Sequence, residues 1–257
     1  EKSGRAMNIE WNAEQYKNDF SFVPEYGAGI LDLLTAPRGA AVVDLGCGNG
    51  ALTERLAARG YRVIGIDDSA AQIQAARAAH PGLSFRQGNA LDFSLEEKAD
   101  AVFSNAVFHW IDEEKQPDML QNIAAQLKRG GELVAEFGGH GCGESVHAAL
   151  EEAFASRGLR YRRPFYFPTI GQYAPLLEQC GFTVRYATLF DRPTPQKGAD
   201  GLKNWIDMFL KTPFAGMEES QKAQIIAEAE NRLRQKLCRG GIWYVDYVRL
   251  RLRAEKT

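Results

Sequence analysis

Residues 41–50, AVVDLGCGNG, constrain the fold of this chain more than any other stretch. The short apolar run Ala41–Leu45 predicts a buried strand of a parallel sheet, and Leu52 and Leu56, four residues apart, predict a helix after it. Between them, glycines occupy three alternate positions. A strand, a glycine loop and a helix N-terminus in this order let a ligand approach the backbone closely. The stretch therefore predicts a ligand site at the carboxyl end of a strand.

The residues of this loop favour some ligands over others. Gly46, Gly48 and Gly50 have no Cβ atoms that would hold a nucleoside or an amino acid away from the backbone. Asp44 places a negative charge where the pyrophosphate of a dinucleotide would be repelled. A ligand that carries a sulfonium and an ammonium group suits this position better.

A second strand, Tyr61–Ile66, is followed by two acids, Asp67 and Asp68. Ser69, with Gln72 three residues later, forms a capping-box pattern that starts the next helix. Asp67 lies about twenty residues beyond the glycine loop, which in a strand–helix–strand unit places its carboxylate at the neighbouring strand tip. A carboxylate there is expected to accept hydrogen bonds from both hydroxyls of a ribose.

The alternation of strands and helices continues to about residue 137. Further strands are predicted at Leu83–Gln87, Asp100–Asn105 and Glu132–Phe137, with a helix at Gln116–Leu127. Because the connections are short, the pattern predicts one doubly wound parallel sheet.

The second half of the chain has a different pattern. Helices are predicted at Ser145–Ser156 and Ile170–Cys180, and a strand at Phe182–Thr188. In residues 248–253 valine and leucine alternate with arginine, which is typical of an antiparallel strand with one exposed face. Between these two strands, residues 199–240 predict a helical insertion.

The motif D-L-G-C-G-N-G, together with Asp67 and the end of the fourth strand, resembles the cofactor site of class I S-adenosylmethionine-dependent methyltransferases. The order of signals is similar from about Gly27 to Arg253. The resemblance implies an α/β, Rossmann-like sheet of seven strands in the order 3-2-1-4-5-7-6, with strand 7 antiparallel. The helical insertion would lie between strands 6 and 7, and residues 1–26 would form an N-terminal arm. The stretches FSNAVFHW, LKRGGELVAEFGG and FDRPTP resemble a bacterial subgroup that methylates small molecules, including trans-aconitate, and malonyl-carrier protein.

The same resemblance implies S-adenosylmethionine as the cofactor and assigns residues to it position by position. Asp44 and the loop would hold the methionine part, Asp67 would bind the ribose, and Asn89 would accept a hydrogen bond from the adenine amino group. The residues implied to bind the cofactor are Asp44, Gly46, Cys47, Gly48, Asp67, Asp68, Asn89, Ala90 and Asn105.

Methyl transfer from a sulfonium is an in-line displacement, so residues beyond the fourth strand are candidates for the acceptor side. His109 is the candidate general base, and the alternative is a packed, hydrogen-bonding histidine. The insertion, about residues 199–240, is expected to form a lid over the acceptor pocket, although helices that bury sheet surface or form a dimer contact are the alternative. The candidate substrate-binding residues are Tyr16, Phe20 and Phe22 of the arm and Trp205 of the insertion, and the cations offered to an acidic acceptor are Lys203, Lys211, Arg232 and Arg234. For the aromatic residues of the arm, the alternative is that they only anchor it against the domain.

Composition and motifs argue against several classes of binding partner. A net charge of −2 provides no basic field for nucleic acid. The fourth strand ends in Asn105-Ala106-Val107-Phe108 and lacks an Asn-Pro-Pro-aromatic tetrapeptide. In the families that methylate adenine or glutamine, that tetrapeptide binds the planar nitrogen. No apolar run approaches the length of a membrane helix, and the polar start shows no secretory signal. The four cysteines are widely spaced and show no metal pattern with the four histidines, which predicts a reduced, cytoplasmic chain without a metal. Residues 1–6 precede Met7 and are open to interpretation as a cloning remnant. No inference rests on them.

We therefore expect S-adenosylmethionine-dependent methyl transfer to a small-molecule acceptor, with carboxylic acids among the candidates and the oligomeric state left open. Two alternatives remain at this point. Gly46-x-Gly48-x-x-Ala51 also fits a loose dinucleotide fingerprint, so an NAD(P)-binding oxidoreductase is one of them. A non-catalytic regulatory protein that binds S-adenosylmethionine is the other.

The basic cluster at residues 157–163 is interpreted as a solvated charge run, with the binding of an acidic substrate or an acyl-carrier protein as the alternative.

Overall fold

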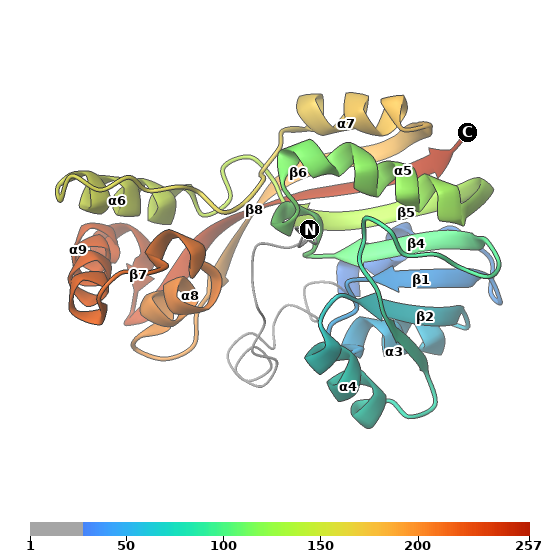
Figure 1. Cartoon of the computed structure of the whole chain (residues 1–257), viewed down its shortest axis with the longest axis horizontal. Coiled ribbons are helices and arrows are strands. Elements are labelled where there is room, and N and C mark those ends of the chain that lie inside the picture. The colour runs from blue at the N-terminus through green and yellow to red at the C-terminus, as the bar shows by residue number, and fades with distance from the viewer. Residues whose placement is uncertain (1–27) are drawn as a thin grey trace.

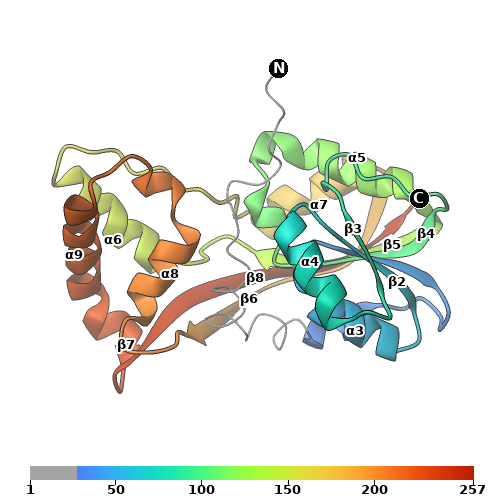
Figure 2. The same ribbon diagram turned by 60° about the horizontal axis from the view of Figure 1, so that its bottom comes forward.

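A computed structural model describes residues 28–257. It has two parts: a twisted sheet with helices on both faces, and a helical cap at one end (Figure 1). Two long strands, β6 (Phe182–Pro195) and β8 (Ile242–Lys256), run from the sheet into the cap, as a second view also shows (Figure 2). These two strands therefore connect the two parts.

The sheet has the strand order β3-β2-β1-β4-β5-β8-β6. Its first five strands are parallel, and β8 runs antiparallel to both β5 and β6. A two-residue strand, β7 (Cys238–Arg239), pairs with β8 outside this path. The predicted order and the antiparallel last strand are thus confirmed, with β8 in the place of strand 7. The other strands are β1 (Ala41–Leu45), β2 (Arg62–Asp67), β3 (Ser84–Gln87), β4 (Ala99–Asn105) and β5 (Leu127–Gly138).

Helices cover both faces of the sheet because each presents one apolar stripe to it. On one face, α5 (Gln116–Gln126) and α7 (Ile170–Gln179) share a core with strand residues such as Val102. On the other, η1 (Ala28–Leu33) and α3 (Ala51–Ala58) pack on Val42 and Phe103. Element η1 is a 3₁₀ helix. The remaining short elements beside the sheet are α4 (Ala70–Ala79), η2 (Phe108–Trp110) and η3 (Glu113–Lys115).

Strands β6 and β8 are longer than predicted. Pro193 and Pro195 lie inside β6, which is an edge strand, and an edge tolerates residues that have no N–H group. The predicted exposed face of residues 248–253 is wrong. Arg249 is buried, Arg251 forms an ion pair with the buried Glu136, and Arg253 lies 3.6 Å from a carboxylate oxygen of Glu132. The arginine face is therefore largely turned toward buried carboxylates and the protein interior.

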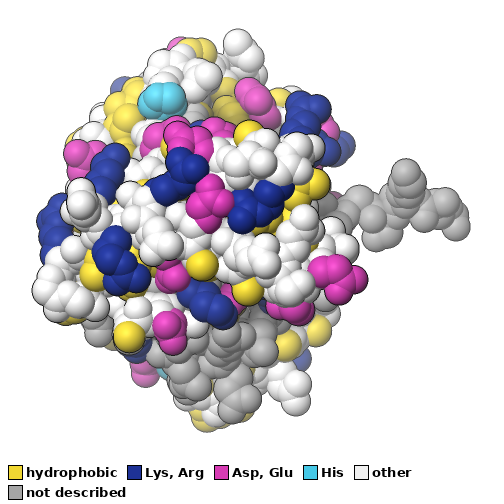
Figure 3. Space-filling model, turned by 90° about the vertical axis from the view of Figure 1, so that its left-hand side faces the viewer, with side chains coloured by type: hydrophobic (Ala, Val, Ile, Leu, Met, Phe, Trp, Pro, Cys, Tyr) yellow, Lys and Arg dark blue, Asp and Glu magenta, His cyan; other side chains and the backbone are white. Residues whose placement is uncertain are grey.

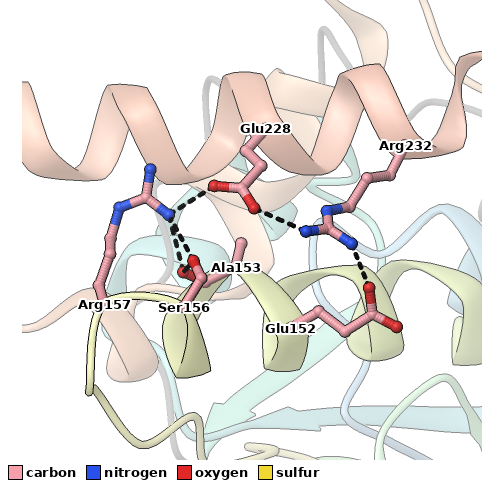
Figure 4. A network of polar contacts seen from close by, with 6 residues as sticks. All are labelled: Glu152, Ala153, Ser156, Arg157, Glu228 and Arg232. Carbon is pink, nitrogen blue, oxygen red and sulfur yellow. Dashed lines mark hydrogen bonds and ion pairs between the residues drawn. The ribbon is translucent and has the colours of Figure 1, made fainter.

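The cap consists of α6 (Glu144–Ala155), α8 (Gly201–Phe209), η4 (Thr212–Phe214), α9 (Glu219–Leu237) and the far end of β8. These elements share a hydrophobic core of their own, which includes Leu150, Ile206 and Ile225. An ion-pair network also joins α6 to α9, in which Glu228 contacts Arg157 and Arg232, and Arg232 contacts Glu152 (Figure 4). The predicted helical insertion is present, and α6, which precedes β6 in the chain, belongs to the same unit.

The outer face of the cap shows basic and acidic side chains side by side (Figure 3). The predicted basic run at residues 157–163 is part of this pattern, since Arg157 pairs with Glu228 and Arg163 pairs with Glu144 and Glu151. The interpretation as a solvated charge run therefore fits. None of the helices in the described part of the chain combines the length and the apolarity that crossing a membrane requires.

Candidate active site

The glycine loop leaves β1 and turns beside the end of β2. The backbone N–H groups of Gly46 and Cys47 both donate to the carbonyl oxygen of Ile66, at 2.7 and 3.1 Å. Gly46, Gly48 and Gly50 have φ values of 76°, 53° and 84°, which only glycine adopts without strain. These bonds and turns fix the loop at the carboxyl end of the sheet.

The three glycines serve different purposes, which the sequence did not separate. A Cβ atom on Gly46 would lie 2.1 Å from Cγ2 of Val107, and one on Gly50 would lie 2.7 Å from the ring of Phe85. Packing against protein therefore requires both of these glycines. A Cβ on Gly48 would meet no atom of residues 28–257 within 4 Å. Among the three glycines, Gly48 is therefore the one that faces space left open by the described residues.

Asp67 connects this loop to the turn that follows β2. One carboxylate oxygen accepts a hydrogen bond from the Gly48 N–H at 2.9 Å, and the other accepts from the Ser69 N–H at 2.9 Å. Each oxygen keeps a lone pair for a further donor. The carboxylate thus lies beside the open space at Gly48, where the sequence placed the ribose hydroxyls.

Asp44 lies beneath the loop and is 2 % exposed, and it accepts a 2.6 Å hydrogen bond from the Thr53 hydroxyl. Burial raises its pKa from 3.8 to about 7, with the hydrogen bond from Thr53 opposing the rise and the charge of Asp67 adding to it. Burial also raises the pKa of Asp67. Within residues 28–257 neither carboxylate forms an ion pair. Two buried acids without a cation fit a cofactor that brings a sulfonium and an ammonium group, and they would repel a pyrophosphate.

The raised pKa of Asp44 gives an expected pH dependence. A bound cation lowers that pKa, so the affinity for S-adenosylmethionine should rise between about pH 6 and about pH 7.5. In the free protein the folded state holds a proton that the unfolded state has released, so this group's contribution to stability falls as the pH rises from about 4 to about 7. Calorimetric titration of the parent and of Asp44→Asn separates the effect from the titration of the ligand itself. Equal pH slopes in the two proteins would contradict the assignment.

The other predicted cofactor residues lie along the same edge of the sheet. Asn105 ends β4, next to β1, while Asp68 and Asn89 follow β2 and β3. The side-chain oxygen of Asn89 already accepts a 2.9 Å hydrogen bond from the Leu91 N–H, which leaves one lone pair for an adenine amino group. Ala90 follows Asn89 in the same half-buried loop. The topology thus brings all of these positions together, and their roles remain predictions.

A pocket opens directly beyond β4, between the sheet and the cap. Its wall begins at Ala106, which has a φ of 63°, rare for a residue with a side chain, and turns the chain out of the strand. It encloses about 490 Å³ of space outside the protein atoms, including its mouth. It is lined by Ala106, His109, Trp110, Cys142, Gly143, Phe165, Phe167, Trp205, Phe209, Tyr247 and Arg249.

His109, the predicted base, lies in the wall of this pocket and is buried. Its Nδ1 accepts a 3.2 Å hydrogen bond from the Gly138 N–H, which places the ring proton on Nε2. Burial lowers its pKa well below 6.5, and the charge of Arg249 lowers it further. His109 is therefore a neutral imidazole whose Nε2–H is a hydrogen-bond donor.

Arg249 is the functional candidate that the sequence missed. It is 8 % exposed, and its Nε atom is buried without a hydrogen-bond partner among residues 28–257. Its guanidinium lies 4.6 Å from the centre of the Tyr247 ring. The residue looked like part of an exposed arginine face, and nothing in the alternation of residues 248–253 distinguished it from Arg251 or Arg253.

The predicted acceptor residues have mixed outcomes. Trp205 lines the pocket, whereas Tyr16, Phe20 and Phe22 lie outside the described residues, as does the rest of the proposed arm. Of the predicted lid cations, Lys203 pairs with Asp207, Arg232 pairs with two glutamates, and Arg234 lies over the Trp243 ring. None of the four is among the described residues that line the pocket. The His, Cys, Asp and Glu side chains of residues 28–257 nowhere gather in a group of three that would hold a metal ion.

Comparison with known proteins identifies the family of the chain. A family model described as a methyltransferase domain matches residues 42–131. A protein of Schizosaccharomyces pombe named uncharacterized methyltransferase C70.08c is 31 % identical over 96 % of this chain and 98 % of its own length. A trans-aconitate 2-methyltransferase of Mycolicibacterium gilvum is 33 % identical over 68 % of this chain and 70 % of its own length.

The chain belongs to the class I S-adenosylmethionine-dependent methyltransferases, and S-adenosylmethionine is its cofactor. Within them it resembles the trans-aconitate methyltransferase group. Solved structures share the fold. A TehB-like methyltransferase of Corynebacterium glutamicum gives a TM-score of 0.56 at 18 % identity and covers 95 % of this chain and 98 % of that one. The magnesium protoporphyrin IX methyltransferase of Synechocystis gives 0.54 at 19 % identity and covers 95 % and 84 %.

Proposed function

We propose that the enzyme transfers the methyl group to the carboxylate of a small-molecule acid bound in the pocket beyond β4. The observation that supports this most is Arg249, a buried guanidinium whose Nε has no partner among the described residues. An unpaired buried donor is costly, and a ligand carboxylate would satisfy it with a charge-assisted hydrogen bond. Several relatives are named trans-aconitate 2-methyltransferases, so an acid as acceptor also agrees with the comparisons.

The residues of the pocket suit this reaction. S-adenosylmethionine supplies a methyl group that is already activated by the sulfonium. A carboxylate, ionised at neutral pH, would attack the methyl carbon without a base, and S-adenosylhomocysteine would leave with the electrons of the broken carbon–sulfur bond. Arg249 would pair with one carboxylate oxygen and leave the other free to attack. His109 would donate its Nε2–H to the same group, which makes it a positioning donor in place of the base predicted from sequence. The aromatic walls would exclude water.

The function is tested with a panel of small acids, alcohols and amines. We expect S-adenosylhomocysteine to form with acids, together with a base-labile methyl ester. With the best acid, Arg249→Met should lower kcat/KM by about 10- to 100-fold, mainly through KM, because one charged hydrogen bond is lost. Arg253→Met is the matched control, since it removes a guanidinium from the same strand outside the pocket, and it should leave KM unchanged. Methylation of alcohols or amines alone would overturn the proposal.

We further propose that the cap segment at about residues 199–240 acts as a lid. Trp205 and Phe209 of α8 form part of the pocket wall, so movement of this helix would open the pocket. Hydrogen exchange should slow in residues 199–214 when S-adenosylhomocysteine and an acid bind. Residues 170–179 of α7, which pack on the sheet, serve as the internal control. If exchange in 199–214 is unchanged, the alternative of static packing or a dimer contact holds instead.

A further inference from the structure

We infer that the acceptor is a monocarboxylic acid with an apolar, aromatic or long aliphatic body, and that acids with two or three carboxylates are poor substrates. This inference rests on the proposed function and specifies its substrate class. It departs from the acceptor named for several relatives, trans-aconitate, which carries three carboxylates. The charges and the walls of the pocket support it.

The polar groups of the described pocket wall gather at one end. Arg249 lies opposite Gly138 in the register of β5 and β8, and the Gly138 N–H holds the ring of His109. Tyr247, two residues before Arg249 on the same strand, places its ring under the guanidinium. One carboxylate would therefore satisfy Arg249 and His109 together. The described wall has no second pair of side-chain donors that would bind another carboxylate.

The rest of the wall is aromatic. Phe165 stacks on Phe167 at 5.1 Å between ring centres, and Trp110 contacts Phe165 edge-on at 4.8 Å. The indole N–H of Trp205 is already donated to the Tyr247 hydroxyl at 2.6 Å. Burial of an apolar body against such walls is favourable, whereas burial of a charge there is unfavourable because the charge loses its hydration.

Charge balance disfavours a polyacid against this wall. Arg249 carries the one permanent positive charge among the described residues that line the pocket. The nearby histidines do not add a second positive charge. Burial lowers the pKa of His109 well below its usual value. Burial also lowers the pKa of His147, whose ring contacts those of Phe165 and Phe167, to about 4. The carboxylate of Asp246 adds negative charge close by, since its charge contributes to the raised pKa of the pocket residue Cys142. Its Oδ1 atom is buried without a described hydrogen-bond partner. A second ligand carboxylate would be buried unpaired, which is strongly unfavourable.

The test uses acids that carry one, two or three carboxylates. Octanoate and octanedioate have the same chain length, 3-phenylpropionate adds an aromatic body, and trans-aconitate represents the polyacids. We expect kcat/KM for octanoate or 3-phenylpropionate to exceed that for octanedioate and trans-aconitate by at least about 30-fold. Preference for octanedioate or trans-aconitate would overturn this inference and leave the carboxylate proposal standing. If no acid is methylated, both fail.

A variant tests the charge argument directly. Phe209→Lys adds a second cation to the aromatic wall and should raise the ratio of octanedioate to octanoate turnover at least about tenfold. Tyr186→Lys adds the same charge on the exposed surface of β6 and should leave the ratio unchanged. S-adenosylhomocysteine binding and the melting temperature show whether each variant is folded. A folded, cofactor-binding Phe209→Lys protein with the parent's ratio would contradict the charge argument.

Discussion

Asp67→Ala is expected to weaken S-adenosylmethionine binding by at least about 100-fold while the protein stays folded. If the carboxylate accepts hydrogen bonds from both ribose hydroxyls, as predicted, each contributes about 1.5–3 kcal/mol, and the substitution removes both. The fold should survive because burial raises the pKa of Asp67, so the carboxylate is a desolvated charge that the free protein does not need for stability. Calorimetry gives the affinity and thermal melting gives the stability.

Asp68→Ala is the control for this experiment. It removes a carboxylate one residue away in the same turn, and its affinity for the cofactor should stay within about tenfold of the parent, because one polar contact contributes about 1 kcal/mol. Asp67→Ala protein that binds S-adenosylmethionine within about twofold of the parent would show that the ribose lies elsewhere.

Gly48→Val should abolish cofactor binding, with a loss of more than about 100-fold, because the added branch would occupy the space that the nucleoside or methionine part needs. No atom of residues 28–257 lies within 4 Å of the new Cβ, so a clash with the described part of the protein is not the cause. Backbone strain is the remaining confounder, because φ is 53° at this position. Binding of S-adenosylmethionine and the melting temperature are measured together.

Gly240→Val controls for that strain. Gly240 has a φ of 57°, and a Cβ there also meets no described atom within 4 Å, but it lies in the β7–β8 turn. Both variants should lose a similar amount of stability, about 1–2 kcal/mol, and only Gly48→Val should lose the cofactor. If both bind it equally, Gly48 does not face the ligand.

The parallel half of the fold could be predicted because its signals are local. Ala41–Leu45 is a nearly continuous apolar run, as a strand buried on both faces requires. Ser69 does cap α4, accepting a hydrogen bond from the Gln72 N–H. Parallel strands joined by right-handed crossovers bring their carboxyl ends to one edge, so the positions of Asp44 and Asp67 relative to the glycine loop followed from the order of elements.

The acceptor side could not be predicted because its residues depend on long-range packing. Arg249 looked identical to its alternating neighbours until the cap and β5 enclosed it. Val107 and Phe85 explain Gly46 and Gly50, and no pattern within the loop reveals contacts with residues so far along the chain. The tautomer of His109 depends in the same way on the N–H of Gly138, a residue on another strand. Pairings between distant residues therefore set both the charge and the hydrogen bonding of the pocket.

The position of β8 has a consequence for how the protein is made. β8 follows every other strand in the chain, yet in the sheet it lies between β5 and β6. A nascent chain synthesised only as far as Gly241 has one open edge on β5 and a β6 whose sheet partner does not yet exist. Such edges can pair with other chains. Arg249 and Tyr247, which line the pocket beyond β4, belong to the same strand. Synthesis of β8 therefore completes the sheet and the wall of this pocket together, and a product that stops before β8 has neither.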